Sequence, residues 1–523
     1  MNYADLFRVT LPETMLEVAA LLVLVVDLGL LRKAVLKTRM TVAALLGVAG
    51  CGAALLTVPL EHVGLLDADD LNIIGTGGSV AFLQISILLL TVLTLLLLID
   101  SRFTQHVGEY VSVVLMAASG GLLVVAAQDL LVIFIGLELM SLGLYILTAF
   151  DKSSGRSAEA ALKYYLFGGM STAFLLFGFS YIYGLSGSTN LYWIEGQVAS
   201  AGPSPLLYVA WICIVVGLGF KVAAVPFHFW APDTYEGAPA PAVAFIASVS
   251  KVASFGLIMS FSYYWLMPGG PVSGEAHGVE NWLRSAYLTW QPLSIVLIIV
   301  ATASMIVGNL ASLVQVSVRR LLAYSAIAHA GYILLGLAVK PAYIGQPTAF
   351  HFLLDSTPGI IRSFSAVLYY IVTYGLTTIG AFGVVSVVER ATGSDRFDSF
   401  LGLHKRNPLL AAVLLVLILS LAGIPPLVGF WAKFNLFAAV LGVNAGPVPF
   451  ALVALAVALS AVSLYYYLQV LKRAYVMPAV DETPIKAHPV TMAVLLLIAA
   501  AVVVLGCFPA LLQGWIQSFY PVL

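Results

Sequence analysis

The stretch at residues 211–230, WICIVVGLGFKVAAVPFHFW, places Lys221 inside an otherwise apolar run. Three further runs share this pattern: LLVIFIGLELMSLGLYILTAF (130–150) holds Glu138, PAVAFIASVSKVASFGLIM (241–259) holds Lys251 and PPLVGFWAKFNLFAAV (425–440) holds Lys433. A charged side chain at the centre of a bilayer costs roughly 3 kcal/mol on insertion scales. Such residues tend to face a protein interior, to pair, or to line an ion path. The four runs therefore predict ion or proton movement through a membrane protein.

The composition supports the same class of protein. The chain has 523 residues, of which 61% are hydrophobic and 9% are charged, whereas a soluble domain is about 25% charged. Apolar stretches of helical length recur throughout, and each can cross a ~30 Å hydrocarbon core. We therefore expect an all-α polytopic membrane protein with about 14 transmembrane helices. The first apolar run, 11–31, is too long for a cleaved signal peptide and is read as the first span.

Redox and nucleotide chemistry are not expected in this chain. Cys51, Cys213 and Cys507 are scattered singly, so no iron–sulfur or zinc spacing exists. There is no phosphate-binding glycine motif either.

Charged loops divide the spans into two sides. The approximate spans are 11–31, 40–60, 77–99, 109–127, 129–150, 160–184, 206–230, 239–266, 291–314, 320–338, 362–389, 408–440, 449–471 and 489–512. Lys and Arg concentrate in the loops after the first, fifth, ninth, eleventh and thirteenth spans, and they are absent from 60–76, 184–205 and 441–448. Under the positive-inside rule, both termini then face the outer side.

The middle of the chain resembles a duplication. ALKYYLFGGMSTAF (161–174) is similar to AVLYYIVTYGLTTIGAF (366–382), and VPFHFWA (225–231) is similar to PPLVGFWAK (425–433). Five helices per copy would give two inverted repeats. The expected units are N-terminal helices at 1–108, a first repeat at 109–266, a second repeat at 291–471 and a last helix at 472–523.

Prolines predict one broken helix in each repeat. Pro226 interrupts the seventh span, and Pro425 and Pro426 interrupt the twelfth. Proline removes a backbone donor, and within lipid the freed carbonyls need protein or water partners. A break beside a lysine therefore suggests a wet cavity, with a packed proline kink as the alternative.

Three long motifs resemble a known family. The stretches KVAAVPFHFWAPDTYEGAPAPAVAFIASVSKVASF (221–255), RRLLAYSAIAHAGYILLG (319–336) and SLAGIPPLVGFWAKF (420–434) resemble signatures of the proton-translocating, antiporter-like subunits of respiratory complex I. Related multisubunit cation/proton antiporters share them. Within the family the chain is most similar to the subunit N members. Lys433 in the twelfth span, Lys163 in the sixth and an end after the fourteenth span favour that assignment.

The resemblance implies roles for the buried charges. Glu138 and Lys221 match an input pair in which a carboxylate tunes a lysine, Lys251 matches a connecting lysine, and Lys433 matches an exit-side proton carrier. A static ion pair is the alternative for Glu138 and Lys221. For Lys251 the alternative is snorkelling, which its mid-span position disfavours.

Weaker candidates accompany these four residues. His329, in IAHAGY, is either a proton relay between the two halves or a structural, hydrogen-bonded histidine. Lys163 is either a relay residue or an interfacial anchor, and His228 is either a relay residue or a helix cap. Asp233 and Glu236 are read as turn residues near proton entry.

The resemblance therefore implies a proton-translocating subunit of NADH:quinone oxidoreductase in a bacterial inner (plasma) membrane. NADH, FMN, iron–sulfur clusters and quinone are expected in or near partner subunits, and no cofactor or metal in this chain. The expected partners are the neighbouring subunit M, the small subunits K, J and A, and lipid, but not nucleic acid. The alternatives are a subunit of a multisubunit cation/proton antiporter, a passive scaffold with relic lysines, and a self-sufficient transporter.

Overall fold

The computed structural model describes residues 7–58, 73–75, 77–101, 103–266, 276–338, 349–443, 446–479 and 481–519. These residues form helices joined by loops and a few isolated β-bridges. The elements are α2 (Leu11–Val25), η1 (Val26–Leu30), α3 (Leu36–Thr57), α4 (Gly78–Leu98), α5 (Val107–Ala126), α6 (Leu130–Thr148), α7 (Gly155–Ser186), α8 (Leu191–Ala201), α9 (Pro205–Lys221), α10 (Trp230–Gly237), α11 (Ala240–Phe245), η2 (Ile246–Ser250), α12 (Lys251–Leu266), α13 (Ala276–Ser312), α14 (Val318–Ala338), α15 (Ala349–Thr392), η3 (Phe397–Phe400), α16 (Leu403–Arg406), α17 (Pro408–Ala422), α18 (Val428–Val443), α19 (Pro447–Tyr475), α20 (Pro489–Cys507) and α21 (Ala510–Gln517).

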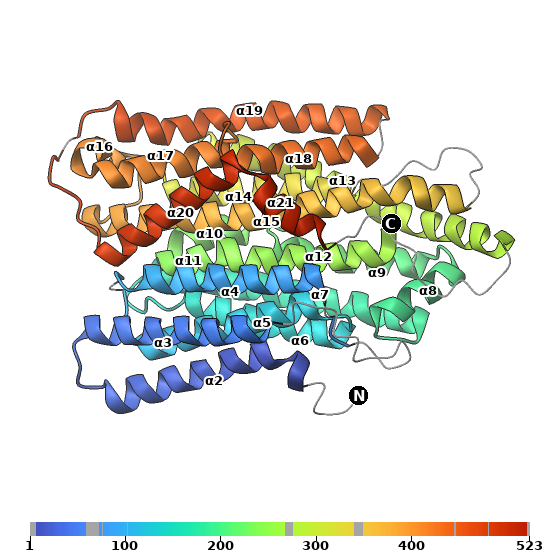
Figure 1. Cartoon of the computed structure of the whole chain (residues 1–523), viewed down its shortest axis with the longest axis horizontal. Coiled ribbons are helices and arrows are strands. Elements are labelled where there is room, and N and C mark those ends of the chain that lie inside the picture. Colours follow the sequence, from blue (N-terminus) through green and yellow to red (C-terminus); the bar gives the residue numbers. More distant parts are fainter. Residues whose placement is uncertain are drawn as a thin grey trace.

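Most of the helices run side by side along the long axis of the molecule (Figure 1). The N-terminal helices α2 and α3 lie at one edge and α19 lies at the other, with α4, α11, α12 and α15 between them (Figure 1). Among the described residues, 11 helices are long and apolar enough to cross a membrane, and α9, α17 and α18 are shorter apolar helices. The prediction of an all-α polytopic membrane protein is confirmed.

Every predicted span has a helical counterpart, but two helices are longer than expected. Helix α13 begins at Ala276 and α15 at Ala349, ahead of the predicted spans 291–314 and 362–389. Hydropathy detects only the portion that can lie in lipid, and backbone hydrogen bonding continues through the polar residues before it. The number of spans and the two repeats remain predictions.

Three of the central helices are not regular. The chain leaves α9 at Lys221 and resumes in α10 at Trp230, with Pro226 between them. In the same way α17 ends at Ala422 and α18 begins at Val428. Gly423 closes α17 with a φ of 86°, a left-handed conformation that glycine adopts without steric cost. A π-helical segment, η2, directly precedes Lys251.

Basic loops gather at one end of the molecule. A bridge joins Ser317 to Arg396, and Arg319 pairs with Glu389 at 2.6 Å. The loop between α2 and α3 and the short helix α16 lie at the left end of Figure 1, whereas α8 lies at the right end. This arrangement agrees with the charge pattern of the loops.

We predict that the basic end is cytoplasmic. Cysteines can be placed at Lys33, in the exposed turn before α3, and at Gln197, on the exposed side of α8. In a background without the three native cysteines, Lys33→Cys should react with an impermeant thiol reagent only from the inside, and Gln197→Cys only from the outside. Labelling of Lys33→Cys from the outside would refute the orientation.

Candidate functional site

Lys221 is held at the C-terminal end of the interrupted helix α9. Its side chain is buried, and Nζ donates to Ser141 Oγ of α6 at 2.5 Å. The backbone turns sharply just beyond it, with Ala223 in the left-handed region at φ 58°, a conformation that is uncommon for a residue other than glycine. The break therefore fixes the lysine at a helix end rather than along a continuous helix.

Glu138 lies near Lys221 but does not contact it directly. The two charges are close enough to interact electrostatically, yet the ion pairs among the described residues do not include them. Glu138 Oε1 instead accepts from Thr172 Oγ1 of α7 at 2.8 Å. Ser141, one turn along α6, takes the lysine hydrogen bond. Glu138 and Lys221 are therefore linked indirectly, because Ser141, on the same helix as Glu138, accepts the hydrogen bond from Lys221.

The Glu138 side chain is also less buried than its apolar sequence context predicts. It is half-buried and shares an α6 stripe with Leu131, Ile135 and Leu142, whose side chains are 57%, 57% and 50% exposed. Helical spacing places these positions on one face. An apolar run shows that a segment enters the membrane, but it does not show which face turns outward.

Lys251 is buried in the centre of the molecule. Its Nζ donates to the carbonyl oxygen of Ala326 in α14 at 2.8 Å and lies 5.9 Å from the centre of the Tyr374 ring. The π-helical segment before it shifts the register of the helix, and such segments are frequent at functional sites.

Lys433 occupies the second helix break. Its Nζ donates to the carbonyl oxygens of Leu421 and Ala422 at 3.2 and 3.1 Å, and to Ser460 Oγ at 2.9 Å. The last carbonyls of a helix lack internal partners and carry partial negative charge. The ammonium group therefore caps α17 from the neighbouring helix α18.

His329 lies on α14 between tyrosine hydroxyls. Its Nδ1 is 2.8 Å from Tyr370 Oη, and its Nε2 is 3.4 Å from Tyr467 Oη. Both ring nitrogens therefore have a partner that can donate or accept. His329, Tyr370 and Tyr374 also line a cavity that reaches Ser420 at the end of α17.

The weaker candidates lie outside this set. Lys163 is 40% exposed, and its Nζ is 2.7 Å from both Glu159 Oε1 and Asp233 Oδ2. Burial alone would raise the pKa of Asp233, but hydrogen bonds from Lys163 and Arg320 outweigh it and hold that pKa below its ordinary value. His228 is buried in the first break and stacks on Phe229 with ring centroids 4.5 Å apart.

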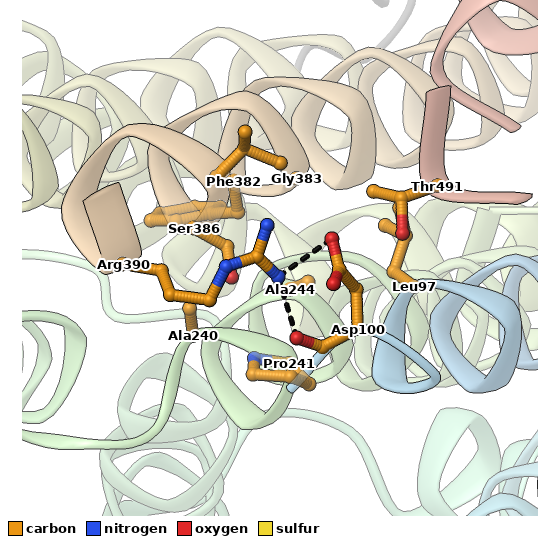
Figure 2. Close-up of a pocket in the computed structure, with 11 residues that line it drawn as sticks. Leu97, Asp100, Ala240, Pro241, Ala244, Phe382, Gly383, Ser386, Arg390 and Thr491 are labelled. Carbon is orange, nitrogen blue, oxygen red and sulfur yellow. Dashed lines mark hydrogen bonds and ion pairs between the residues drawn. The ribbon is translucent and has the colours of Figure 1, made fainter. Parts of the chain in front are cut away.

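A second pocket lies between α4, α11, α15 and α20 and has an ion pair in its lining. Figure 2 shows Arg390 reaching the carboxylate and the backbone carbonyl of Asp100, with Nη1 2.6 Å from Asp100 Oδ2. Its other lining residues, such as Ala244, Phe382 and Thr491, are uncharged. None of the candidate lysines lines this pocket.

Sequence reasoning missed the neutral partners of the lysines. Ser141, Ser460 and Tyr370 carry no distinguishing motif, and the carbonyl partners carry no side-chain signal at all. Only Ser141 could have been found, because it lies three residues after Glu138 and therefore on a nearby part of the same helix face.

Comparison with known proteins places the chain in a family. The family described as "NADH:quinone oxidoreductase/Mrp antiporter, TM" matches residues 127–273, 283–357 and 353–463. A chain of respiratory complex I from Thermus thermophilus with bound aureothin is 30% identical, with a TM-score of 0.73, and 96% of this chain and 98% of that chain are covered. The Mrp complex from Dietzia sp. has a chain with a TM-score of 0.74 at 20% identity, covering 98% of this chain and 97% of that one, which shows a shared fold.

The chain therefore belongs to the transmembrane subunits of the NADH:quinone oxidoreductase and Mrp antiporter family. Within that family it belongs with NADH-quinone oxidoreductase subunit N. The "subunit N 2" protein of Acidobacterium capsulatum is 46% identical over 99% of both chains. The "subunit N 1" protein of Roseiflexus castenholzii is 40% identical over 82% of this chain and 76% of that one. The predicted family assignment is confirmed.

We predict that Ser141→Ala slows proton transfer at Lys221. A hydrogen bond to a charged group contributes about 1.5–3 kcal/mol, so its loss should slow that step by roughly tenfold or more. NADH-driven proton pumping in membranes with fully assembled complex is the measurement.

Ser86→Ala is the matched control, because Ser86 is buried in α4 and, among the described residues, its hydroxyl donates to the carbonyl of Phe82 in its own helix. Equal pumping in the Ser141 and Ser86 variants would show that the hydroxyl does not hold the lysine for transfer.

Proposed function

We propose that this chain carries protons across the membrane as a subunit of NADH:quinone oxidoreductase, through Glu138, Lys221, Lys251, His329 and Lys433. One observation carries the proposal. Each of the three lysines is buried, and among the described residues each Nζ donates to serine hydroxyls or backbone carbonyls. A buried ammonium group without a paired carboxylate is costly. Such a lysine can release its proton without breaking an ion pair.

Residues of α14 lie between Lys251 and Lys433 and support the proposal that protons pass from one lysine to the other. Ala326 accepts from Lys251, His329 follows one turn later, and the Tyr332 ring lies 5.5 Å from Lys433 Nζ. Positions three residues apart lie on one helix face. Together with the cavity beside His329, this face offers a short path between the two lysines.

The position of Glu138 supports the proposal that a neighbouring subunit covers the exposed face of α6. A carboxylate among exposed apolar side chains would face lipid in an isolated chain, which is unfavourable. Another membrane subunit covering this face would remove that cost. Homology makes the partners of this chain other complex I subunits; we propose that M and the small subunits K, J and A are among them.

Lys163 and His228 are proposed for supporting roles at the basic end and at the first break. The group formed by Lys163, Asp233 and Arg320 joins α7, α10 and α14. It consists of charged groups that are partly exposed to solvent, and this supports a place near proton entry from the cytoplasm of a bacterial cell. We place both termini on the outer side and the two repeats at 109–266 and 291–471.

The chain would supply no redox centre, so the driving reaction belongs to partner subunits. Among the described residues there is no group of three or more His, Cys, Asp or Glu side chains that could hold a metal ion. We propose that NADH, FMN, iron–sulfur clusters and quinone bind in or near other subunits of the complex.

We predict that Lys433→Arg separates charge from proton release. Arginine keeps the positive charge and can donate to the Leu421 and Ala422 carbonyls, but it stays protonated at any working pH. We expect the complex to assemble while proton transfer through this chain slows by about 100-fold or more. Protons pumped per NADH oxidised is the measurement, with assembly checked on native gels.

Lys472→Arg provides the same substitution at an exposed position in the last turn of α19 and should pump normally. Full pumping by Lys433→Arg would mean that a fixed charge suffices, and the relay role of Lys433 would be withdrawn.

A further inference from the structure

A buried polar pair lies among the N-terminal helices, on elements that carry none of the lysines. Glu13 belongs to the first turn of α2 and Gln84 to the second turn of α4. The two side chains are 6% and 3% exposed, and Gln84 Nε2 donates to Glu13 Oε1 at 3.3 Å. Glu13 Oε2 and Gln84 Oε1 are also buried, and neither has a hydrogen-bond partner among the described residues.

Glu13 Oε2 and Gln84 Oε1 lack a hydrogen-bond donor among the described residues. If Glu13 were ionised, both atoms would be acceptors and no donor would lie between them. A protonated carboxyl group and a primary amide are instead complementary: the amide N–H donates to one carboxyl oxygen, and the acid O–H donates to the amide oxygen. The first of these two bonds is present, and one proton on Glu13 Oε2 supplies the second.

The charges around Glu13 favour the neutral form. The charged group facing it is Glu17, one turn further along α2, whose Oε1 accepts from Ser119 Oγ of α5. Asp27 lies in η1, beyond the far end of α2, and is neutralised there by Arg39 of α3 at 2.6 Å. Glu13 forms no ion pair with any described residue of α3, α4 or α5.

Aromatic side chains pack on another face of the end of α4 that carries Gln84. The Phe82 ring packs on Trp515 and Phe519, with centroids 4.9 and 5.8 Å apart. Trp515 belongs to α21, and Phe519 lies two residues beyond the end of that helix. Glu13 itself is only 6% exposed, so an ionised carboxylate there would lose most of its hydration.

We propose that Glu13 binds a proton, held between its Oε2 and Gln84 Oε1, and that this acid–amide pair fastens α2 to α4. The proton is taken from water during folding, and no oxidation or group transfer is involved. The competing arrangement is an ionised Glu13 with a water molecule donating to both oxygens.

The test compares wild type with Glu13→Gln in the purified complex. The glutamine side chain can donate N–H to Gln84 Oε1 and so retains both hydrogen bonds, but it cannot titrate. Thermal denaturation midpoints are measured from about pH 6 to about pH 9, where a glutamate in the unfolded chain is ionised.

The two arrangements predict different pH dependences. If the folded state keeps a proton on Glu13 and the unfolded state does not, each pH unit disfavours the folded wild type by up to about tenfold relative to Glu13→Gln. The wild-type midpoint should therefore fall, relative to the variant, as the pH rises. An ionised Glu13 gives the same protonation in both states, so a constant difference would overturn the proposal.

Two further variants test whether the effect belongs to Glu13 and depends on Gln84. Glu17→Gln removes the neighbouring, exposed carboxylate on the same helix and should leave the pH trend in place. Gln84→Leu removes both hydrogen bonds and should lower the midpoint at every pH. An unchanged midpoint in Gln84→Leu would also contradict the proposal, because the pair would then not fasten the helices.

Discussion

The cost of an ammonium group in an apolar interior governs the arrangement of this protein. Each buried lysine needs a hydrogen-bond acceptor, and a directly paired carboxylate would favour the charged form of the lysine and so oppose proton release. The structure meets this need with neutral oxygens. Lys433 Nζ donates to the last two carbonyl oxygens of α17. These oxygens have no partner within the helix because α17 stops at Ala422. The helix break and the buried lysine therefore depend on each other.

The other two lysines also lie at irregular helix segments, but their acceptors are not carbonyls freed by a break. Lys221 donates to a serine hydroxyl, and Lys251 donates to the Ala326 carbonyl inside the continuous helix α14, although the carbonyls of a regular α-helix are mostly used by its own hydrogen bonds. The end of α9 at Lys221, the π-helical segment before Lys251 and the end of α17 all depart from that regularity. A substitution that restored a continuous helix at α17 would remove the acceptors of Lys433 without touching the lysine.

The sequence predicted the fold class, the family and the positions of both helix breaks. Hydropathy runs and prolines are strong local signals, and long motifs identify relatives. It did not predict that Lys221 bonds to Ser141 rather than to Glu138, or that Lys251 bonds to a backbone carbonyl. Such partners depend on how helices distant in sequence pack, and backbone atoms are the same at every residue.

The most direct test of proton transfer through the lysines is the number of protons pumped per NADH oxidised in a complex that carries Lys251→Met. Lys251 is the central lysine, and methionine fills a similar volume without a titratable group. The account predicts a ratio below that of wild type in a fully assembled complex. An unchanged ratio would contradict it, because protons would then cross this membrane arm without the central lysine.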